Sequence, residues 1–71
     1  MRPIVVLGAG SWGTALAIQF ARGGERTVLW GRAEDDPGEL ARARRNERYL
    51  PGAEFPPSLA IEPDLARAIG S

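Results

Sequence analysis

Residues 4–13, IVVLGAGSWG, pass from an apolar run directly into a glycine-rich turn. The run Ile4–Leu7 is continuous and rich in β-branched residues, which is typical of a strand buried on both faces of a parallel sheet. Good helix formers follow the glycines, so we predict a helix over residues 14–22 that ends at Gly23. A second short strand is expected at Thr27–Trp30. Strand, helix and strand in this order predict a right-handed βαβ unit with parallel strands.

The remaining residues continue the alternation of helix and strand. Asp36, placed before a proline, predicts an N-cap for a helix over residues 37–46. Residues 49–57, YLPGAEFPP, contain three prolines and a glycine and therefore predict a loop. A third short strand is expected at residues 59–63 and a further helix at residues 64–69. The predicted fold class is α/β: a Rossmann-type parallel sheet with flanking helices, incomplete at β-α-β-α-β.

Composition excludes several kinds of protein. The 71 residues allow one small domain, and a hydrophobic fraction of 44% is that of a globular chain. Nine basic and nine acidic residues give a net charge of +0, so no basic field favours nucleic acid. No apolar run approaches the roughly 20 residues that span a membrane, and Ile4–Leu7 is shorter than the roughly 7–15 residues of a signal-peptide core. We therefore expect a cytoplasmic chain with neither nucleic acid nor membrane as a partner.

The residue types that usually perform catalysis are scarce. All nine basic residues are Arg, and the sequence contains no Lys, His or Cys. No carboxylates cluster at metal-ligand spacing, so we expect no metal site. Acid–base chemistry would fall to carboxylates or to Tyr49. We therefore expect that any activity is completed by residues outside this sequence.

The glycines match the pattern G-x-G-x-x-G between a predicted strand and a predicted helix. In that pattern Gly8 permits the tight turn, Gly10 lets a pyrophosphate approach the backbone, and Gly13 lets the helix pack closely on the strand. The free N–H groups and the dipole of the helix N-terminus favour an anion. The spacing therefore predicts dinucleotide binding, with a purely structural glycine turn as the alternative.

The end of the second predicted strand bears on the choice of cofactor. NAD-type sites usually place a carboxylate roughly 20 residues beyond the glycines to bind the ribose hydroxyls. Here the sequence reads Trp30-Gly31-Arg32, and Glu34 follows later. A guanidinium at Arg32 can pair with a 2′-phosphate, which favours NADP over NAD. The alternative is that Arg32 is simply a solvated residue at the end of a strand.

Arginines gather further along the chain and raise the possibility of a nucleic-acid surface. They are Arg42, Arg44, Arg45 and Arg48. Glutamates are interleaved with them at spacings that permit ion pairs, such as Glu39 with Arg42. We therefore interpret them as a solvated, charged surface of the second helix.

Four stretches together resemble one family. They are GAGSWGTALA (residues 8–17), VLWGR (28–32), NERYLPG (46–52) and LAIEPDLARAI (59–69). This combination resembles the start of bacterial NAD(P)-dependent glycerol-3-phosphate dehydrogenases and covers nearly the whole chain. The resemblance implies an oxidoreductase that interconverts dihydroxyacetone phosphate and sn-glycerol 3-phosphate with NADPH or NADH, in glycerophospholipid synthesis. It also implies that residues 1–71 are the N-terminal part of a dinucleotide-binding domain, with the substrate domain absent.

The resemblance also implies roles for individual residues. Ser11 and Trp12 match positions that contact the cofactor, and Arg32 matches a basic position at the strand end. Tyr49 matches an aromatic position near the adenosine end. Ala33 replaces a second basic residue of some members, which weakens the preference for NADP. The catalytic lysines of the family lie beyond residue 71, so no catalytic residue is assigned.

Two readings remain beside this one. The chain is alternatively the NADP-binding portion of another two-domain dehydrogenase, of the 6-phosphogluconate or hydroxyacid type, or a non-enzymatic nucleotide-binding module. A three-stranded parallel sheet leaves two open edges. We therefore expect the rest of an enzyme, or a partner chain, to cover it, and the 71 residues alone to be inactive.

Overall fold

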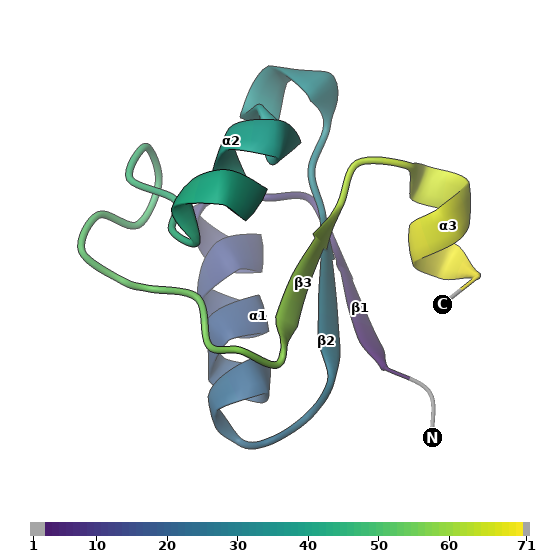
Figure 1. The fold of residues 1–71 in the computed structure, drawn as a ribbon, viewed down its shortest axis with the longest axis horizontal. Helices are drawn as coiled ribbons and strands as arrows, with labels where there is room; N and C mark the ends of the chain where they lie inside the picture. Colours follow the sequence, from purple (N-terminus) through teal and green to yellow (C-terminus); the bar gives the residue numbers. More distant parts are fainter. Residues whose placement is uncertain (1–2, 71) are drawn as a thin grey trace.

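The computed structural model describes residues 3–70 and contains a three-stranded parallel sheet with helices on both faces (Figure 1). The elements, in chain order, are β1 (Ile4–Leu7), α1 (Ser11–Arg22), β2 (Thr27–Trp30), a 3-10 turn (Ala33–Asp35), α2 (Pro37–Ala43), β3 (Leu59–Glu62) and α3 (Leu65–Ile69). The predicted α/β class and the β-α-β-α-β order are confirmed.

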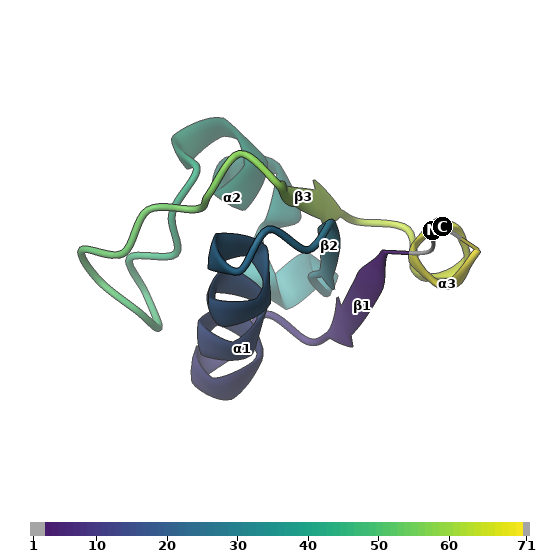
Figure 2. The ribbon, with the colours of Figure 1, turned by 90° about the horizontal axis from the view of Figure 1, so that it is seen from below.

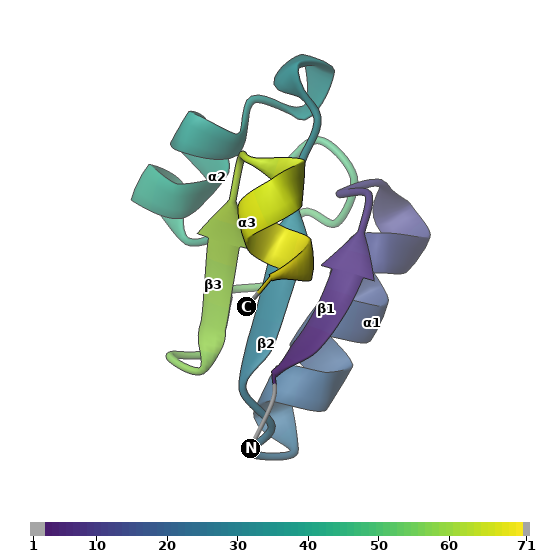
Figure 3. The same ribbon diagram turned by 90° about the vertical axis from the view of Figure 1, so that its right-hand side faces the viewer.

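The sheet order is β1-β2-β3, so β2 is the central strand. Its Leu29 pairs in register with Val6 of β1 and with Ile61 of β3. Figures 2 and 3 place α1 and α2 together on one face of the sheet and α3 on the other, and both strand-to-strand crossovers are right-handed. All three strands therefore end at the same edge of the sheet, where the turns after β1 and β2 come together.

The core lies between α1 and the sheet. The small side chains Ala17 and Ala21 of α1 are buried and let the helix approach the strands closely. Leu29 of β2 and Leu59 of β3 fill the space beneath them. The small residues of this helix therefore lie on its buried face.

The expectation that β1 is buried on both faces is wrong for these residues. Along the described chain β1 pairs only with β2 and forms one edge of the sheet. Its residues are partly buried, and Leu7 at its carboxyl end is 55% exposed. The apolar run correctly predicts a parallel strand, but sequence alone does not give the position of a strand in the sheet.

Four predicted boundaries shift; helix α3, for example, begins at Leu65 rather than at residue 64. Helix α1 begins at Ser11 rather than at residue 14, because Gly10 acts as its N-cap and Gly13 lies inside the first turn. Helix α2 ends at Ala43 rather than at residue 46, because Arg44 adopts a left-handed conformation with φ 58°. Strand β3 ends at Glu62, one residue early.

The predicted N-cap at Asp36 is present, and the structure adds a second aspartate cap at Asp64. Asp36 directly precedes Pro37, the first residue of α2, and its carboxylate accepts a hydrogen bond from the Glu39 N–H. Asp64 caps α3 in the same way by accepting from the Arg67 N–H. These local signals therefore position α2 and α3 as the sequence indicates.

Candidate functional site

The glycine turn, residues 8–13, joins β1 to α1 at the carboxyl edge of the sheet (Figure 1). Gly8 has φ +107°, a conformation that side chains rarely adopt, and its N–H donates to the Trp30 carbonyl at 2.9 Å. A Cβ atom at Gly13 would lie 1.9 Å from the Gly8 carbonyl oxygen. Gly8 and Gly13 are therefore required by the backbone of the turn itself.

Gly10 differs from the other two glycines. It has φ −77°, which any residue adopts, and a Cβ atom there would meet no atom within 4 Å. The fold therefore does not explain a glycine at this position, whereas close approach of a ligand to the backbone would explain it.

The N-terminus of α1 lies at Gly10, where a Cβ atom would meet no other atom within 4 Å. The first intrahelical bond runs from the Thr14 N–H to the Gly10 carbonyl at 2.9 Å, so the helix itself supplies no acceptors for the preceding N–H groups. No acidic residue lies in the first turn, and Gly10 provides no side-chain cap. These N–H groups and the helix dipole favour an anion such as a pyrophosphate.

The β2 tip, residues 31–35, lies beside the glycine turn. A Cβ atom at Gly31 would lie 3.6 Å from the Cβ of Ala9, so the two turns pack together. The Arg32 side chain is 56% exposed, and its Nε donates to the Asp35 carboxylate at 3.5 Å. The same carboxylate accepts from the Arg32 backbone N–H at 3.0 Å. The guanidinium thus leaves the strand end toward solvent with a carboxylate beside it.

Ser11, Trp12 and Tyr49 lie around the start of α1. The Ser11 hydroxyl donates to the Tyr49 backbone carbonyl at 3.2 Å, which brings residues 38 positions apart into contact. The Tyr49 ring lies 5.2 Å from the guanidinium of Arg48. Trp12 is 83% exposed. The Trp12 ring therefore points into solvent and does not pack against the sheet.

Asn46 belongs to the same region but is not among the residues singled out from the sequence. It is 3% exposed, and its Nδ2 donates to the Ala9 carbonyl and to the Thr14 hydroxyl, each at 2.9 Å. In the sequence it looks like the end of a charged helix, and no local pattern marks it as buried. A weak signal is that Asn is a poor helix former, which favours ending the helix before it.

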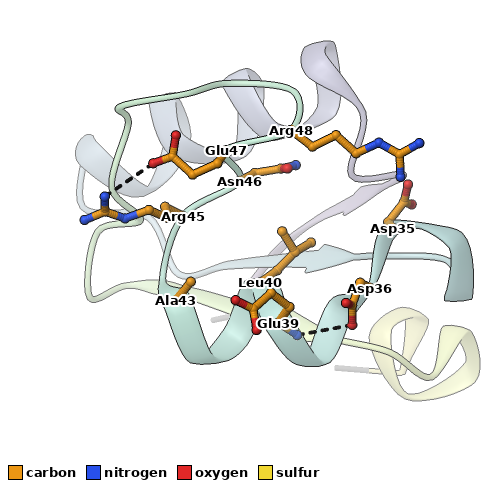
Figure 4. A pocket seen from close by; sticks show the side chains of 9 residues that line it. All are labelled: Asp35, Asp36, Glu39, Leu40, Ala43, Arg45, Asn46, Glu47 and Arg48. Atoms are coloured by element: carbon orange, nitrogen blue, oxygen red, sulfur yellow. Dashed lines mark hydrogen bonds and ion pairs between the residues drawn. The ribbon is translucent and has the colours of Figure 1, made fainter.

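A cavity of about 290 Å³ lies behind Asn46, between α2 and residues 45–48 (Figure 4). Carboxylates line it, among them Asp36 and Glu39, and Figure 4 shows Arg45 turned toward Glu47. Because an anion entering the cavity would meet these carboxylates, it is less suited to phosphate than the open N-terminus of α1.

The interpretation of the four arginines as a solvated surface of the second helix holds only for Arg42. The other three lie beyond the end of α2 at Ala43, and Arg44 is part-buried and donates to the Pro56 carbonyl at 2.8 Å. Arg42 pairs with Glu39 on α2, as expected, and Arg45 pairs with Glu47 and Glu54. Among residues 3–70, no group of three or more His, Cys, Asp or Glu side chains is arranged to hold a metal. Over the same residues, no helix has the length and hydropathy needed to cross a membrane.

The three parallel strands, the flanking helices and the glycine turn define a Rossmann-like fold of the dinucleotide-binding class. Residues 3–71 match the family model for the NAD-dependent glycerol-3-phosphate dehydrogenase N-terminus. The chain belongs to this family, which selects that reading over the 6-phosphogluconate or hydroxyacid type of dehydrogenase.

Individual relatives agree with the family match. A glycerol-3-phosphate dehydrogenase (NAD(P)+) of Pseudoalteromonas translucida is 56% identical over 68 residues, which are 96% of this chain and 20% of that protein. The Coxiella burnetii glycerol-3-phosphate dehydrogenase structure superposes with a TM-score of 0.91 at 43% identity, covering 97% of this chain and 21% of that one. The Plasmodium falciparum enzyme gives 0.75 at 25% identity, covering 94% and 21%. The chain therefore spans about one fifth of the length of these relatives.

Proposed function

We propose that this chain holds the dinucleotide cofactor of a glycerol-3-phosphate dehydrogenase, which interconverts dihydroxyacetone phosphate and sn-glycerol 3-phosphate. The cofactor pyrophosphate lies on the glycine turn, against the N–H groups of Ser11, Trp12 and Gly13. The observation that carries this proposal is the difference between the glycines. Gly8 and Gly13 are required by the backbone, whereas Gly10 opens onto free space at a helix N-terminus.

The ribose end of the cofactor lies at the β2 tip in this proposal. The exposed guanidinium of Arg32 pairs with a 2′-phosphate, so NADP is favoured over NAD. Two carboxylates already lie near that guanidinium, Asp35 at 3.5 Å and Glu34 at 3.9 Å. Since they partly neutralise its charge, we expect a modest preference. Tyr49, whose backbone carbonyl accepts from the Ser11 hydroxyl, and the exposed Trp12 ring contribute side walls of the site.

Hydride transfer requires residues that this chain does not contain. It has no Lys, His or Cys, so we propose no catalytic residue within it. Residues 1–71 are then the N-terminal part of a dinucleotide-binding domain, and the substrate-binding residues belong to a further polypeptide segment. A cytoplasmic location remains a prediction.

The same segment would cover the open parts of the sheet. Within residues 3–70, β1 has a strand neighbour on one side only. Leu7 is 55% exposed and Ile69 of α3 is 63% exposed. Apolar surface of this kind next to an unpaired strand edge is usually buried against another element.

Isothermal titration of the 71-residue chain with NADPH and NADH tests the binding part of the proposal. We expect both to bind, NADPH more tightly, and neither to be turned over with dihydroxyacetone phosphate. A chimera in which these residues replace the matching segment of the Coxiella burnetii enzyme should reduce dihydroxyacetone phosphate. A folded chain that binds neither cofactor at millimolar concentration would refute the proposal.

A further inference from the structure

Residues 46–50 cross the carboxyl edge of the sheet and contact both turns of the candidate cofactor site. We call them the strap. At its start, Asn46 donates to the Ala9 carbonyl inside the glycine turn and to the Thr14 hydroxyl on α1. In its middle, the Tyr49 carbonyl accepts from Ser11, the first residue of α1. The Arg48 guanidinium donates to the Glu34 carbonyl at the β2 tip, at 3.2 Å.

The three contacts differ in their exposure to water. The bonds made by Ser11 and Arg48 are exposed, whereas both Asn46 bonds are buried. A buried hydrogen bond holds its partners in place, because breaking it leaves polar groups without water or protein partners. Asn46 therefore makes the contact that holds the strap most firmly, and the exposed bonds of Ser11 and Arg48 add to it.

The conformation of the chain before the strap places Asn46 there. Arg44 turns left-handed and ends α2, and its carbonyl accepts from the Phe55 N–H at 2.7 Å. The Leu50 N–H then donates to the Asn46 carbonyl at 2.8 Å, which closes the strap into a turn. The Asn46 amide is directed under the glycine turn by this backbone rather than by a flexible surface loop.

We propose that Asn46 is a positioning residue for the cofactor. By holding the Ala9 carbonyl on one side and the Thr14 hydroxyl on the other, it fixes the glycine turn relative to the first turn of α1. The N–H groups that would receive the pyrophosphate are then pre-aligned before the ligand arrives, so less binding free energy is lost in ordering them. Asn46 itself does not contact the cofactor. This inference rests on the proposed function.

The test compares Asn46→Ala and Asn46→Asp with the wild-type 71-residue chain, using NAD⁺ as the probe because it lacks a titrating 2′-phosphate. We expect Asn46→Ala to weaken NAD⁺ binding about tenfold, the size of effect that loss of a buried hydrogen bond produces. Thr27→Val is the matched control. Like Asn46→Ala, it removes a hydrogen-bond donor from a buried residue, here the Thr27 hydroxyl that donates to the Glu25 carbonyl at the opposite end of β2. It should lower stability and leave the NAD⁺ affinity unchanged.

The pH profile of Asn46→Asp separates positioning from a general loss of stability. Burial raises the pKa of the introduced carboxyl group. Once protonated, that group can donate to the Ala9 carbonyl as the amide did; once ionised, it cannot. The affinity of this variant, relative to wild type, should therefore recover as the pH falls from about 8 to about 5, where buried carboxyl groups titrate. The ionisable groups lining the neighbouring cavity are Asp35, Asp36, Glu39, Arg45, Glu47 and Arg48. Wild type and Asn46→Asp share these groups. Their own titration is therefore removed when the NAD⁺ affinity of the variant is divided by that of wild type at each pH.

The possible outcomes distinguish failure of the proposed cofactor-binding function from failure of the positioning role of Asn46. A wild-type chain that does not bind NAD⁺ would refute the proposed function and this inference with it. A wild-type chain that binds, together with folded Asn46 variants of equal affinity, would overturn only the inference. The same holds if Thr27→Val weakens binding as much as Asn46→Ala, or if both Asn46 variants unfold and Asn46→Asp recovers no binding at low pH, because Asn46 would then be purely structural.

Discussion

The α-carbon of Gly13 lies so close to the carbonyl of Gly8 that a Cβ atom at Gly13 would approach the Gly8 oxygen to 1.9 Å. Because the atom that would have to move belongs to the backbone of the turn, a side-chain rotation cannot relieve this overlap. The contact fixes how closely α1 approaches the end of β1. It also separates the two glycines that the fold needs from Gly10, which the fold does not need.

The variant Gly13→Ala should therefore be strongly destabilised. Alanine favours the helix by about 1 kcal/mol over glycine, but overpacking against a backbone atom typically costs about 1–3 kcal/mol and occasionally more. Because the overlapping atom is a backbone oxygen, we expect a cost at or above the top of this range and a net loss of about 2 kcal/mol or more in the free energy of unfolding, measured by urea denaturation followed by circular dichroism. A variant as stable as wild type would mean that the turn is not packed as described.

Gly10→Ala is the matched variant with the opposite outcome. Its backbone conformation is open to alanine and no atom lies within 4 Å of the new methyl group. We expect a change in unfolding free energy below about 1 kcal/mol, the scale of an altered N-cap. NADPH binding should fall at least about tenfold because the methyl group occupies the approach of the pyrophosphate. Unchanged affinity, measured by calorimetry, would count against a pyrophosphate at this position.

Arg32→Ala tests the choice of cofactor. If the guanidinium holds a 2′-phosphate, NADPH affinity should fall about tenfold while NADH affinity changes little, because charge-assisted hydrogen bonds are worth about 1.5–3 kcal/mol. The loss should shrink in high salt, because the side chain is 56% exposed and its interactions are screened. Arg42→Ala, which removes the same charge from α2, is the control and should affect neither cofactor. If Arg32→Ala left the ratio of NADPH affinity to NADH affinity unchanged, Arg32 would have no role in binding the 2′-phosphate.

Trp12→Ala tests whether the exposed Trp12 ring contributes to cofactor binding. Since its side chain is 83% exposed, we expect the unfolding free energy to change by less than about 0.5 kcal/mol, as for other surface positions. Cofactor affinity should nevertheless fall several-fold, because the ring forms a side wall of the proposed site. Equal affinity of the variant and wild type would assign the Trp12 ring to another surface of the complete protein.

Much of this fold is predictable because its signals are local. The apolar run Ile4–Leu7, the glycines of the turn and the carboxylate cap at Asp36 each act over a few residues, and each appears where the sequence indicates. The ion pair of Arg42 with Glu39 follows from helical spacing in the same way.

What escapes prediction depends on contacts between distant residues. Asn46 is buried because Ala9 and Thr14, more than thirty positions away, supply its partners. Asp35 turns back to the Arg32 N–H and partly neutralises the guanidinium that the sequence offers as a phosphate ligand. Likewise, the edge position of β1 follows from the strand order, which no single segment determines.

Titration of the ¹⁵N-labelled chain with NADPH, followed residue by residue through the backbone amide resonances, tests the central claim most directly. The account predicts saturable shifts that are largest at the amides of residues 10–13 and extend to Arg32 at the β2 tip. It predicts smaller shifts at the far end of the sheet, around Thr27. Saturable binding whose largest shifts fall elsewhere, or no shifts at millimolar NADPH in a folded chain, would contradict the account.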